Sequence, residues 1–295
     1  MFNTLKYYKL WLAISGLILL FGVISLFTFG LKLGIDFTGG SMIEIKFKQP
    51  YDQNLVRQAF DEKGLQGSQF QASENFSLIV RTRPLEKAEY DSIIESVKSK
   101  AGDLEESQFE SIGPVVGKEL KAKAIYQLIF VSLGILFYIG YAFRKVAKPI
   151  TSWKFGLAAV IALFHDLLFV IGVFSILGKF KGIEIDSMFI TAVLTVLGFS
   201  VHDTIVVFDR IRENLKVKAG NTLDFIINHS IAQTIVRSLN TSLTVLFVLL
   251  ALLLFGGESI KYFILALFVG IIVGTYSSIF IASPMLMLMQ KKRNN

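Results

Sequence analysis

The 295-residue chain contains no cysteine, which excludes disulfide bonds, a thiolate nucleophile and a cysteine-ligated metal site. It also lacks a stripe of arginine and lysine interleaved with aromatic residues on a soluble segment. Its formal charge of +7 therefore does not indicate binding to nucleic acid. The basic residues cluster beside apolar segments instead, which is typical of a protein whose positive charges set its orientation in a membrane.

Apolar residues make up 53% of the chain and recur in long runs. A run of about 20 residues crosses a hydrocarbon layer about 30 Å thick. The first run is too long for the core of a signal peptide and no small-residue cleavage site follows it, so we expect it to remain as an anchor. The predicted spans are Leu10–Gly30, Ala124–Phe143, Phe155–Gly178, Ser187–Phe208, Leu239–Gly257 and Tyr262–Met289.

The distribution of lysine and arginine predicts the orientation of these spans. If the N-terminus is cytoplasmic, the cytoplasmic segments hold 14 Lys and Arg and the two short outer loops hold three. This bias predicts that both termini are cytoplasmic. Residues 1–30 then form a cytoplasmic N-terminus and the first transmembrane helix, and residues 31–123 form an extracytoplasmic domain. Residues 124–295 form transmembrane helices two to six, with a cytoplasmic amphipathic loop at 209–237.

The outer domain, with 13 Lys/Arg and 15 Asp/Glu, is near neutral and shows the order of a small α+β fold. Alternation and turn signals predict four strands and two helices, with Asp52 as a helix cap, a turn at 73–75 and Pro84 before the second helix. The predicted order is strand Ser41–Gln49, helix Asp52–Lys63, strands Phe70–Ala72 and Phe76–Arg83, helix Leu85–Ala101 and strand Leu104–Ile112. This β-α-β-β-α-β order is the ferredoxin-like arrangement, whose open sheet can bind an extended chain along an edge.

A glycine-rich segment joins the first span to the first strand. The ordinary interpretation of Gly34, Asp36, Gly39 and Gly40 is a connector in which glycines allow positive φ angles and Asp36 caps its own turn.

In the cytoplasmic loop, Asn221 or Thr222 can cap a second helix. Its apolar stripe predicts an amphipathic helix on the membrane surface or against a partner. The stripe consists of Leu223, Ile226, Ile227, Ile231 and Ile235.

Two acidic residues fall inside predicted spans, Asp166 at the middle of the third and Asp203 in the fourth. An Asp near the centre of a span costs about 2.5–3.5 kcal/mol on insertion scales, so it faces a partner or a wet cavity. On a helical wheel Arg210 lies near the azimuth of Asp203, and Ser200 lies about 60° to one side. His202, Thr191 and Thr195 lie about 80–120° to the other side. The wedge formed by these residues is expected to face protein or water. Either acid could also be a structural, hydrogen-bonded carboxylate.

The fifth span begins with a polar row, Arg237, Asn240, Thr241 and Thr244, which share one helix face. An Arg beside an Asp in a low-dielectric wedge stabilises the carboxylate, and protonation of the Asp releases the Arg. Such a pair has two charge states with different packing, which an ion-driven conformational change requires. The alternative is that Arg210 and Arg237 only orient the protein at the cytoplasmic ends of their spans.

Two other chemistries fit the pattern less well. The pairs His165-Asp166 and His202-Asp203 could bind a metal, but adjacent helix residues point about 100° apart, so no metal site is expected. Two Asp on adjacent spans also suggest an intramembrane aspartyl protease. The Gly-x-Gly-Asp surroundings of such an enzyme are absent, because Asp203 follows Phe-Ser-Val-His. We expect neither an enzyme nor a cofactor.

Three motifs give the chain a family resemblance that covers essentially its whole length. They are GIDFTGG at Gly34–Gly40, GFSVHDTIVVFDRIREN at Gly198–Asn214 and NHSIAQTIVRSLNTS at Asn228–Ser242. Together with the layout of spans, they resemble the SecF branch of the bacterial SecDF protein-export family, within the resistance–nodulation–division superfamily. The resemblance implies that Asp203 is an ion-relay acid and Arg237 its intramembrane arginine. His202 departs from the pattern, because many relatives have Asn before the relay Asp.

The resemblance also implies partners. It suggests an obligate complex with SecD, a homologous six-span half, and action beside the SecYEG channel, with YajC as a further candidate partner. The proton or sodium gradient would drive the outer domains to draw an emerging preprotein outward across the bacterial cell membrane. Two rival functions remain open: a gradient-driven half-transporter for a small molecule or lipid, and a structural subunit that only stabilises the channel complex.

Overall fold

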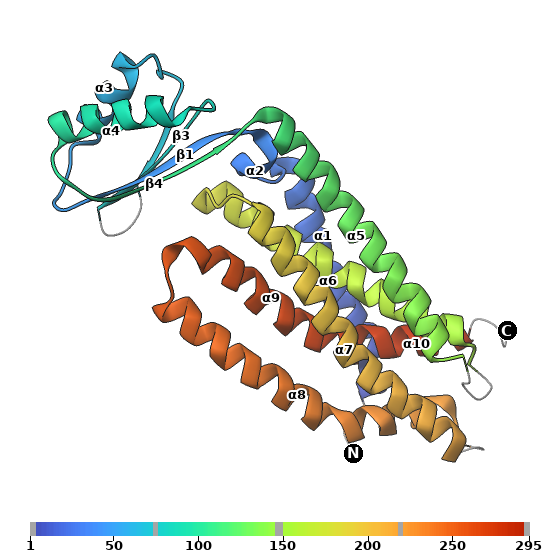
Figure 1. Ribbon diagram of the computed structural model, residues 1–295. Coiled ribbons are helices and arrows are strands. Elements are labelled where there is room, and N and C mark those ends of the chain that lie inside the picture. Colours follow the sequence, from blue (N-terminus) through green and yellow to red (C-terminus); the bar gives the residue numbers. More distant parts are fainter. Residues whose placement is uncertain (1–3, 73–75, 145–149, 218–220, 292–295) are drawn as a thin grey trace. The chain divides into compact units, whose positions relative to one another are not determined.

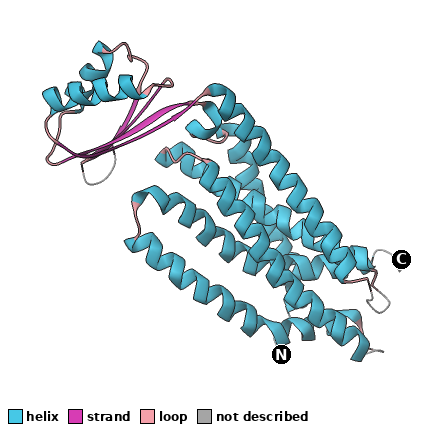
Figure 2. Ribbon diagram, viewed as in Figure 1, coloured by secondary structure: helices cyan, strands magenta, loops and turns pink. Residues whose placement is uncertain are grey.

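The computed structural model describes residues 4–72, 76–144, 150–217 and 221–291. The chain divides into two compact units, one of Leu33–Ile125 and one of Met1–Lys32 with Tyr126–Asn295. Figure 2 shows that strands occur in the first unit and that the second is helical. The predicted turn at 73–75, and Lys145, Lys148 and Lys218 of the cytoplasmic loops, lie outside the described residues.

The smaller unit contains a four-stranded antiparallel sheet in the order β2-β3-β1-β4, backed by two helices (Figure 1). This order with the connectivity β-α-β-β-α-β confirms the predicted ferredoxin-like fold. Its elements are α2 (Ile35–Thr38), β1 (Gly40–Phe47), α3 (Gln53–Glu62), β2 (Gln69–Ala72), β3 (Ser77–Thr82), α4 (Lys87–Ala101) and β4 (Leu104–Ile112).

Alternation along the strands positions the core of this unit. Ile43 and Ile45 of β1 are fully buried and pack against Phe60 of α3 and Ile93 of α4. The predicted cap of α3 is confirmed, because Asp52 Oδ1 accepts a hydrogen bond from Asn54 N at 2.8 Å. The second helix begins at Lys87 rather than Leu85, where the side chains of Glu86 and Glu89 form a reciprocal capping box.

The glycine-rich connector folds as a short ordered element. Ile35 and Phe37 of α2 are buried, and Gly34 rather than Asp36 occupies the N-cap position. Gly39 and Gly40 have positive φ angles of 72° and 127°. A Cβ on Gly39 would lie 2.8 Å from Pro114 Cα, and one on Gly40 would lie 2.9 Å from Thr82 O. The two glycines are therefore required both by backbone conformation and by close packing.

The larger unit has helices at all six predicted spans, each long and apolar enough to cross a membrane. The predicted helical membrane fold with six spans is thus confirmed. The helices are η1 (Thr4–Tyr7), α1 (Tyr8–Phe29), α5 (Pro114–Ala142), α6 (Ser152–Lys181), α7 (Ser187–Val217), α8 (Leu223–Phe255), η2 (Glu258–Ile260), α9 (Lys261–Ser277), η3 (Ser278–Ala282) and α10 (Ser283–Lys291). Helix α5 begins in the smaller unit and continues into the larger one.

The predicted separate amphipathic helix was wrong in two respects. It is the first part of α8 and continues without a break into the fifth span. Its stripe faces this chain rather than the membrane surface or a partner, because Ile226, Ile227 and Ile231 are buried in the core of the helical unit. The predicted cap is confirmed, since the Thr222 hydroxyl accepts a hydrogen bond from Phe225 N.

The sixth span is interrupted by a π-helical turn, η3, between α9 and α10. Pro284 follows this turn, and a proline cannot donate the backbone hydrogen bond that a regular helix requires. The Ser283 hydroxyl donates a hydrogen bond to Ser278 O at 3.2 Å and so supplies a donor to a backbone carbonyl of this turn. The last span therefore changes its helical repeat between α9 and α10, and π turns often occur at functional sites.

Small residues allow the helices to approach closely. A Cβ on Gly172 of α6 would lie 2.7 Å from Gly22 Cα of α1, and Ser25 and Ser175 are hydrogen-bonded at 2.9 Å. Contacts of this kind are a principal source of helix association in lipid. Large apolar side chains of α5 and α8, such as Phe130 and Phe247, are exposed and would face lipid or another subunit.

A candidate ion site among the bundle helices

Asp203 lies on α7 with only 2% of its surface exposed. Three hydroxyl side chains face its carboxyl group, Ser238 and Ser242 of α8 and Thr275 of α9. Ser242 and Thr275 are hydrogen-bonded to each other at 2.5 Å. The buried Asp203 Oδ2 and Ser238 Oγ have no hydrogen-bond partner among the described residues. A buried acid with an unsatisfied oxygen beside hydroxyl groups is a suitable place to bind a proton or a small cation.

His202 does not point into this cluster. It is exposed on the outer face of α7, on the same side of the helix as Thr191, Thr195 and Gly198. The predicted polar wedge is therefore divided, because Asp203 faces α8 and α9 while His202 and the threonines face outward. The imidazole still lies close enough to interact electrostatically with the Asp203 carboxyl group.

Arg237 is also on the outside of the chain. The predicted polar row of α8 is confirmed as a shared face, but Arg237, Asn240 and Thr244 are exposed. The next residue, Ser238, is the one that faces Asp203. Within the described residues, Arg237 and Asp203 form no ion pair. An arginine on the surface of a transmembrane helix would need an anionic group from another subunit or from lipid.

Arg210 has partners of its own at the end of α7. Its Nε donates to Gln233 Oε1 of α8 at 2.6 Å, and its guanidinium pairs with Glu213. Asn214 also donates to Gln233 Oε1, at 2.9 Å. This cluster joins α7 to α8, so Arg210 has a structural role here although it follows Asp203 by two helical turns.

Asp166 of α6 is completely buried and has partners for both oxygens. Its Oδ2 accepts hydrogen bonds from Ser200 Oγ of α7 at 2.6 Å and from Ser277 Oγ of α9 at 2.8 Å. Its Oδ1 lies 3.0 Å from His165 Nδ1. Ser200 therefore belongs to Asp166 rather than to Asp203, and the adjacent His165 and Asp166 do meet, although neighbouring helix residues point apart on a wheel.

Sequence reasoning missed the hydroxyl residues around both acids. Ser238 and Ser242 are four residues apart on one helix face, and this spacing could have indicated a second polar face beside the row of Arg237. Ser277 directly precedes the π turn and Ser278 is its first residue, and the only sequence signal of this turn is Pro284. Gly274 allows α9 to lie close to Ser200 of α7, because a Cβ at Gly274 would lie 2.9 Å from Ser200 Cβ.

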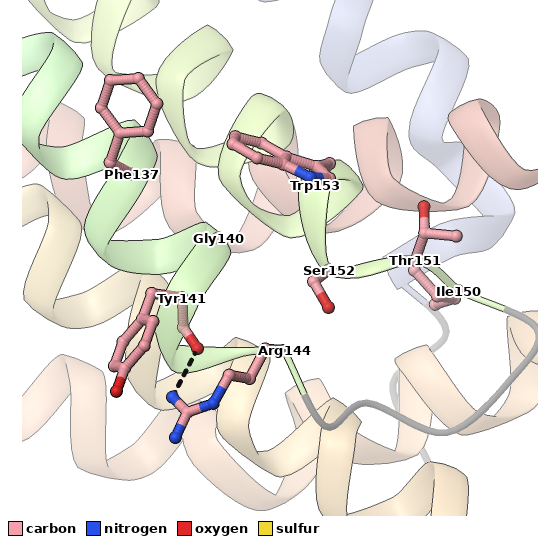
Figure 3. A pocket seen from close by; sticks show the side chains of 8 residues that line it. All are labelled: Phe137, Gly140, Tyr141, Arg144, Ile150, Thr151, Ser152 and Trp153. Carbon is pink, nitrogen blue, oxygen red and sulfur yellow. Dashed lines mark hydrogen bonds between the residues drawn. The ribbon is translucent and has the colours of Figure 1, made fainter.

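Two other kinds of site are relevant to this chain, a metal site and a cavity. Among the described residues, no group of three or more His, Asp or Glu side chains is placed to hold a metal ion. A cavity of about 680 Å³ lies where α5 ends and α6 begins (Figure 3). Its lining includes Tyr141, Arg144 and Trp153, with the Arg144 guanidinium 3.9 Å from the centre of the Tyr141 ring. It contains neither buried acid.

The fold and the site define a class: a multi-pass helical membrane protein with a small α+β domain inserted after its first span. Comparison with known proteins is more specific. Residues 92–292 match the family described as protein export membrane protein SecD/SecF, C-terminal, and residues 24–50 match the SecD/SecF GG motif. The second match contains the connector glycines Gly34, Gly39 and Gly40.

Curated relatives agree over nearly the full length. The chain is 47% identical to the protein translocase subunit SecF of Thermobaculum terrenum, over 95% of this chain and 91% of that protein. It is 39% identical to the SecF of Anaerolinea thermophila, over 98% and 94%. The chain therefore belongs to the SecD/SecF family of bacterial protein-export membrane proteins, as a SecF-type translocase subunit. Such a subunit is a transport component and not an enzyme.

The same fold is present in solved structures. The crystal structure of SecDF from Thermus thermophilus, a translocon-associated membrane protein, has a TM-score of 0.83 and 34% identity. It covers 98% of this chain, and this chain covers 39% of it. SecDF in a super-membrane-facing form has a TM-score of 0.71 and 33% identity, with coverage of 99% and 39%. The chain thus spans about two fifths of the solved SecDF chains, and membership of this family implies association with SecD.

Proposed function

We propose that this chain is the half of a SecD–SecF complex in which binding and release of a proton or sodium ion at Asp203 drives preprotein translocation through the SecYEG channel. The observation that carries the proposal is the environment of Asp203. The acid is buried, one of its oxygens is unsatisfied, and hydroxyl groups from two other helices face it. A change of its charge would alter the packing of α7, α8 and α9 together.

Arg237 fits this function through the partner subunit. It lies on the exposed face of α8 with Asn240 and Thr244, and His202 lies on the exposed face of α7 with Thr195. Polar side chains on the outer faces of membrane helices require polar neighbours, because lipid tails supply none. We assign these two faces to the contact with SecD, where Arg237 would respond to the ion load through an acidic group of that subunit.

The proposed orientation follows from charge. Lysine and arginine concentrate on one side of the spans, so both termini would be cytoplasmic and residues 31–123 would lie outside. The membrane potential supplies enough energy to shift the protein between two conformations. One elementary charge that crosses the membrane releases about 2.3 kcal/mol per 100 mV, which corresponds to a roughly 40-fold bias between two states. The open sheet of the outer domain could contact an extended preprotein along its β2 edge.

The test is the variant Asp203→Asn in membrane vesicles that contain the complete SecDF–SecYEG machinery. The amide keeps the shape of the side chain but cannot exchange a proton, so assembly with SecD should persist while the gradient-dependent part of preprotein export falls at least about tenfold. Separate proton and sodium gradients would identify the coupling ion.

The matched control is Asp209→Asn, an exposed acid on the same helix that pairs with Arg212 at 2.6 Å. This variant should export at the wild-type rate. Full gradient-dependent export by Asp203→Asn would refute the ion-relay role and would leave the chain as a structural subunit.

A further inference from the structure

Asp166 is a second buried acid, and the proposed role of Asp203 makes no use of it. Its carboxyl group joins three helices, because it accepts hydrogen bonds from Ser200 of α7 at 2.6 Å and Ser277 of α9 at 2.8 Å while it belongs to α6. Residues 166, 200 and 277 are far apart in the chain, so this contact is made only by the folded bundle. A buried acid in a membrane span is costly, and acids that are retained there commonly mark functional sites.

The junction contains a proton-sharing pair. His165 Nδ1 lies 3.0 Å from Asp166 Oδ1, so a single proton can lie between the imidazole and the carboxylate. The ring of Tyr276 also faces the imidazole, 6.4 Å away between centroids, and its hydroxyl is bonded to Ser15 of α1 at 2.9 Å.

Within the part of the chain that the structure describes, His165 and Asp166 form an ion pair with each other and with no further charged side chain. From α7 it meets the hydroxyl of Ser200, and the next acid on that helix is Asp203, which faces other residues. From α9 it meets Ser277 and Tyr276. Helix α1 contributes no charged contact, since its single charged residue, Lys9, is exposed.

A change of proton load must change the hydrogen bonds. As a carboxylate, Asp166 accepts from Ser200 and Ser277 on the same oxygen. If that oxygen gains a proton it donates to one of the two hydroxyls, which must then turn its own hydrogen to another acceptor. Ser277 has such an acceptor, because its Oγ lies 3.1 Å from Gly274 O within its own helix. Ser277 can therefore accept from a protonated Asp166 and donate to Gly274 O, and the hydrogen bond between α6 and α9 would reverse its direction.

The position of Ser277 gives this change a structural consequence. It immediately precedes the π turn of η3, whose first residue, Ser278, is hydrogen-bonded to Thr204 of α7 at 3.0 Å and donates to Ser200 O at 3.3 Å. Thr204 adjoins Asp203 in the chain. The Asp166 junction thus lies beside the one place where the last span departs from a regular helix and contacts the helix that carries Asp203.

We infer that His165 and Asp166 form a second proton-binding site of this chain, and that its proton load sets the direction of the hydrogen bonds that join α6 to α7 and to the residue before the π turn. The proton is taken from water and returned to it, and only O–H or N–H bonds change. This inference rests on the proposed ion-driven function, because a second titrating site matters only if the protein cycles between ion-loaded states.

The experiment is infrared difference spectroscopy of the complete complex with SecD in lipid nanodiscs, recorded between high and low pH. Protonated carboxylic acids give a C=O stretching band that carboxylates lack. We expect Asp166→Asn to remove one such band and Asp203→Asn to remove a different one. The control is Glu95→Gln, which replaces an exposed acid of α4. This variant should remove neither of the two bands.

The outcomes separate this inference from the proposed function. If an Asp203→Asn background shows no band that depends on Asp166, the second site is refuted, whatever export does. If Asp203→Asn exports normally but retains an Asp166-dependent band, the relay role of Asp203 fails and the second site stands.

Two further variants guard against a failure of Asp166→Asn to fold. Ser200→Ala and Ser277→Ala each keep the ionisable pair but remove one hydroxyl donor, so each should shift the frequency of the Asp166 band. Ser99→Ala, at a serine whose hydroxyl bonds only within α4, should not shift it. An unshifted band in both buried serine variants would refute the coupling.

Discussion

The two acids buried in the helical unit have opposite environments. Asp166 has a partner for each oxygen, supplied by His165, Ser200 and Ser277. Asp203 has hydroxyl neighbours but an oxygen without a hydrogen bond. One carboxyl group is held by a completed network, and the other faces an incomplete one. The difference shows that the two buried acids would take up a proton in different ways: at Asp166 an existing hydrogen bond must reverse, whereas at Asp203 an unsatisfied oxygen is available.

The largest expected effect is on Asp166, and the contrast with Asp203 is clearest when each acid is truncated. Asp166→Ala leaves three buried polar side chains without their acceptor and should lower the free energy of unfolding by roughly 2–4 kcal/mol, since an unsatisfied group costs about 1–3 kcal/mol and a hydrogen bond in a membrane averages about 0.6 kcal/mol. Asp203→Ala removes an unsatisfied group and should cost less than about 1 kcal/mol. Thermal unfolding of both variants in nanodiscs measures the contrast, and equal losses would abolish it.

A smaller effect is expected from a methyl group near the Asp166 network. A Cβ on Gly274 would lie 2.9 Å from Ser200 Cβ, so Gly274→Ala should cost about 1–3 kcal/mol by overpacking. Gly198→Ala is the matched control on α7, because nothing lies within 4 Å of its Cβ position in this chain. It should leave the isolated chain as stable as before. If the exposed face of α7 contacts SecD, only Gly198→Ala should weaken assembly, which co-purification would detect.

The smallest effect concerns an exposed acid in the outer unit. Arg83 lies beside Glu89 at 2.7 Å and lowers the pKa of that carboxyl group below its ordinary value near 4.5. A carboxyl group with a lower pKa in the folded state stabilises the fold above its unfolded pKa, and this stabilisation is lost as the pH falls through the folded pKa. The protection factors of the amides at the start of α4, which correct for the intrinsic pH dependence of exchange, should therefore fall in acid.

A substitution of Glu89 tests the same explanation at neutral pH. Glu89→Gln should show the faster exchange already at neutral pH, because the capping box and the ion pair are both weakened. Glu95→Gln, on the exposed face of the same helix, should not. A neutral-pH exchange pattern in Glu89→Gln identical to the wild type would mean that the pair contributes nothing to the order of this turn, as is common for surface ion pairs.

Much of the fold could be predicted from periodicity. Strand β4 has the predicted bounds, Leu104–Ile112, and all six spans were found, because alternation and long apolar runs are local properties. The π turn at Ser278–Ala282 was not predicted, since a proline near the end of a span signals an irregularity but not its form. The joining of the cytoplasmic helix to the fifth span was missed because nothing in Arg237–Leu239 marks a continuous helix.

The site was harder to predict than the fold. A helical wheel gives the relative azimuth of residues on one helix but not the rotation of that helix against its neighbours. It therefore grouped Ser200 with Asp203, although Ser200 faces Asp166. The expected pairing of Arg237 with Asp203 comes from the polar row of the fifth span and the family resemblance, and in the structure the next residue, Ser238, faces Asp203 instead. Packing of α6, α7, α8 and α9 decides these contacts, and no local pattern contains that information.

The pairing of β1 with β4 places the two ends of the inserted domain side by side, so the domain can be replaced as a unit. The first residue of β1, Gly40, lies opposite the last residue of β4, Ile112, and Gly39 approaches Pro114 at the start of α5. The polypeptide thus leaves for the domain and returns from it at neighbouring points, a geometry that permits insertion and exchange of whole modules. A short bridge between Thr38 and Pro114 would keep the chain continuous, so related proteins could carry different outer domains on one common helical base.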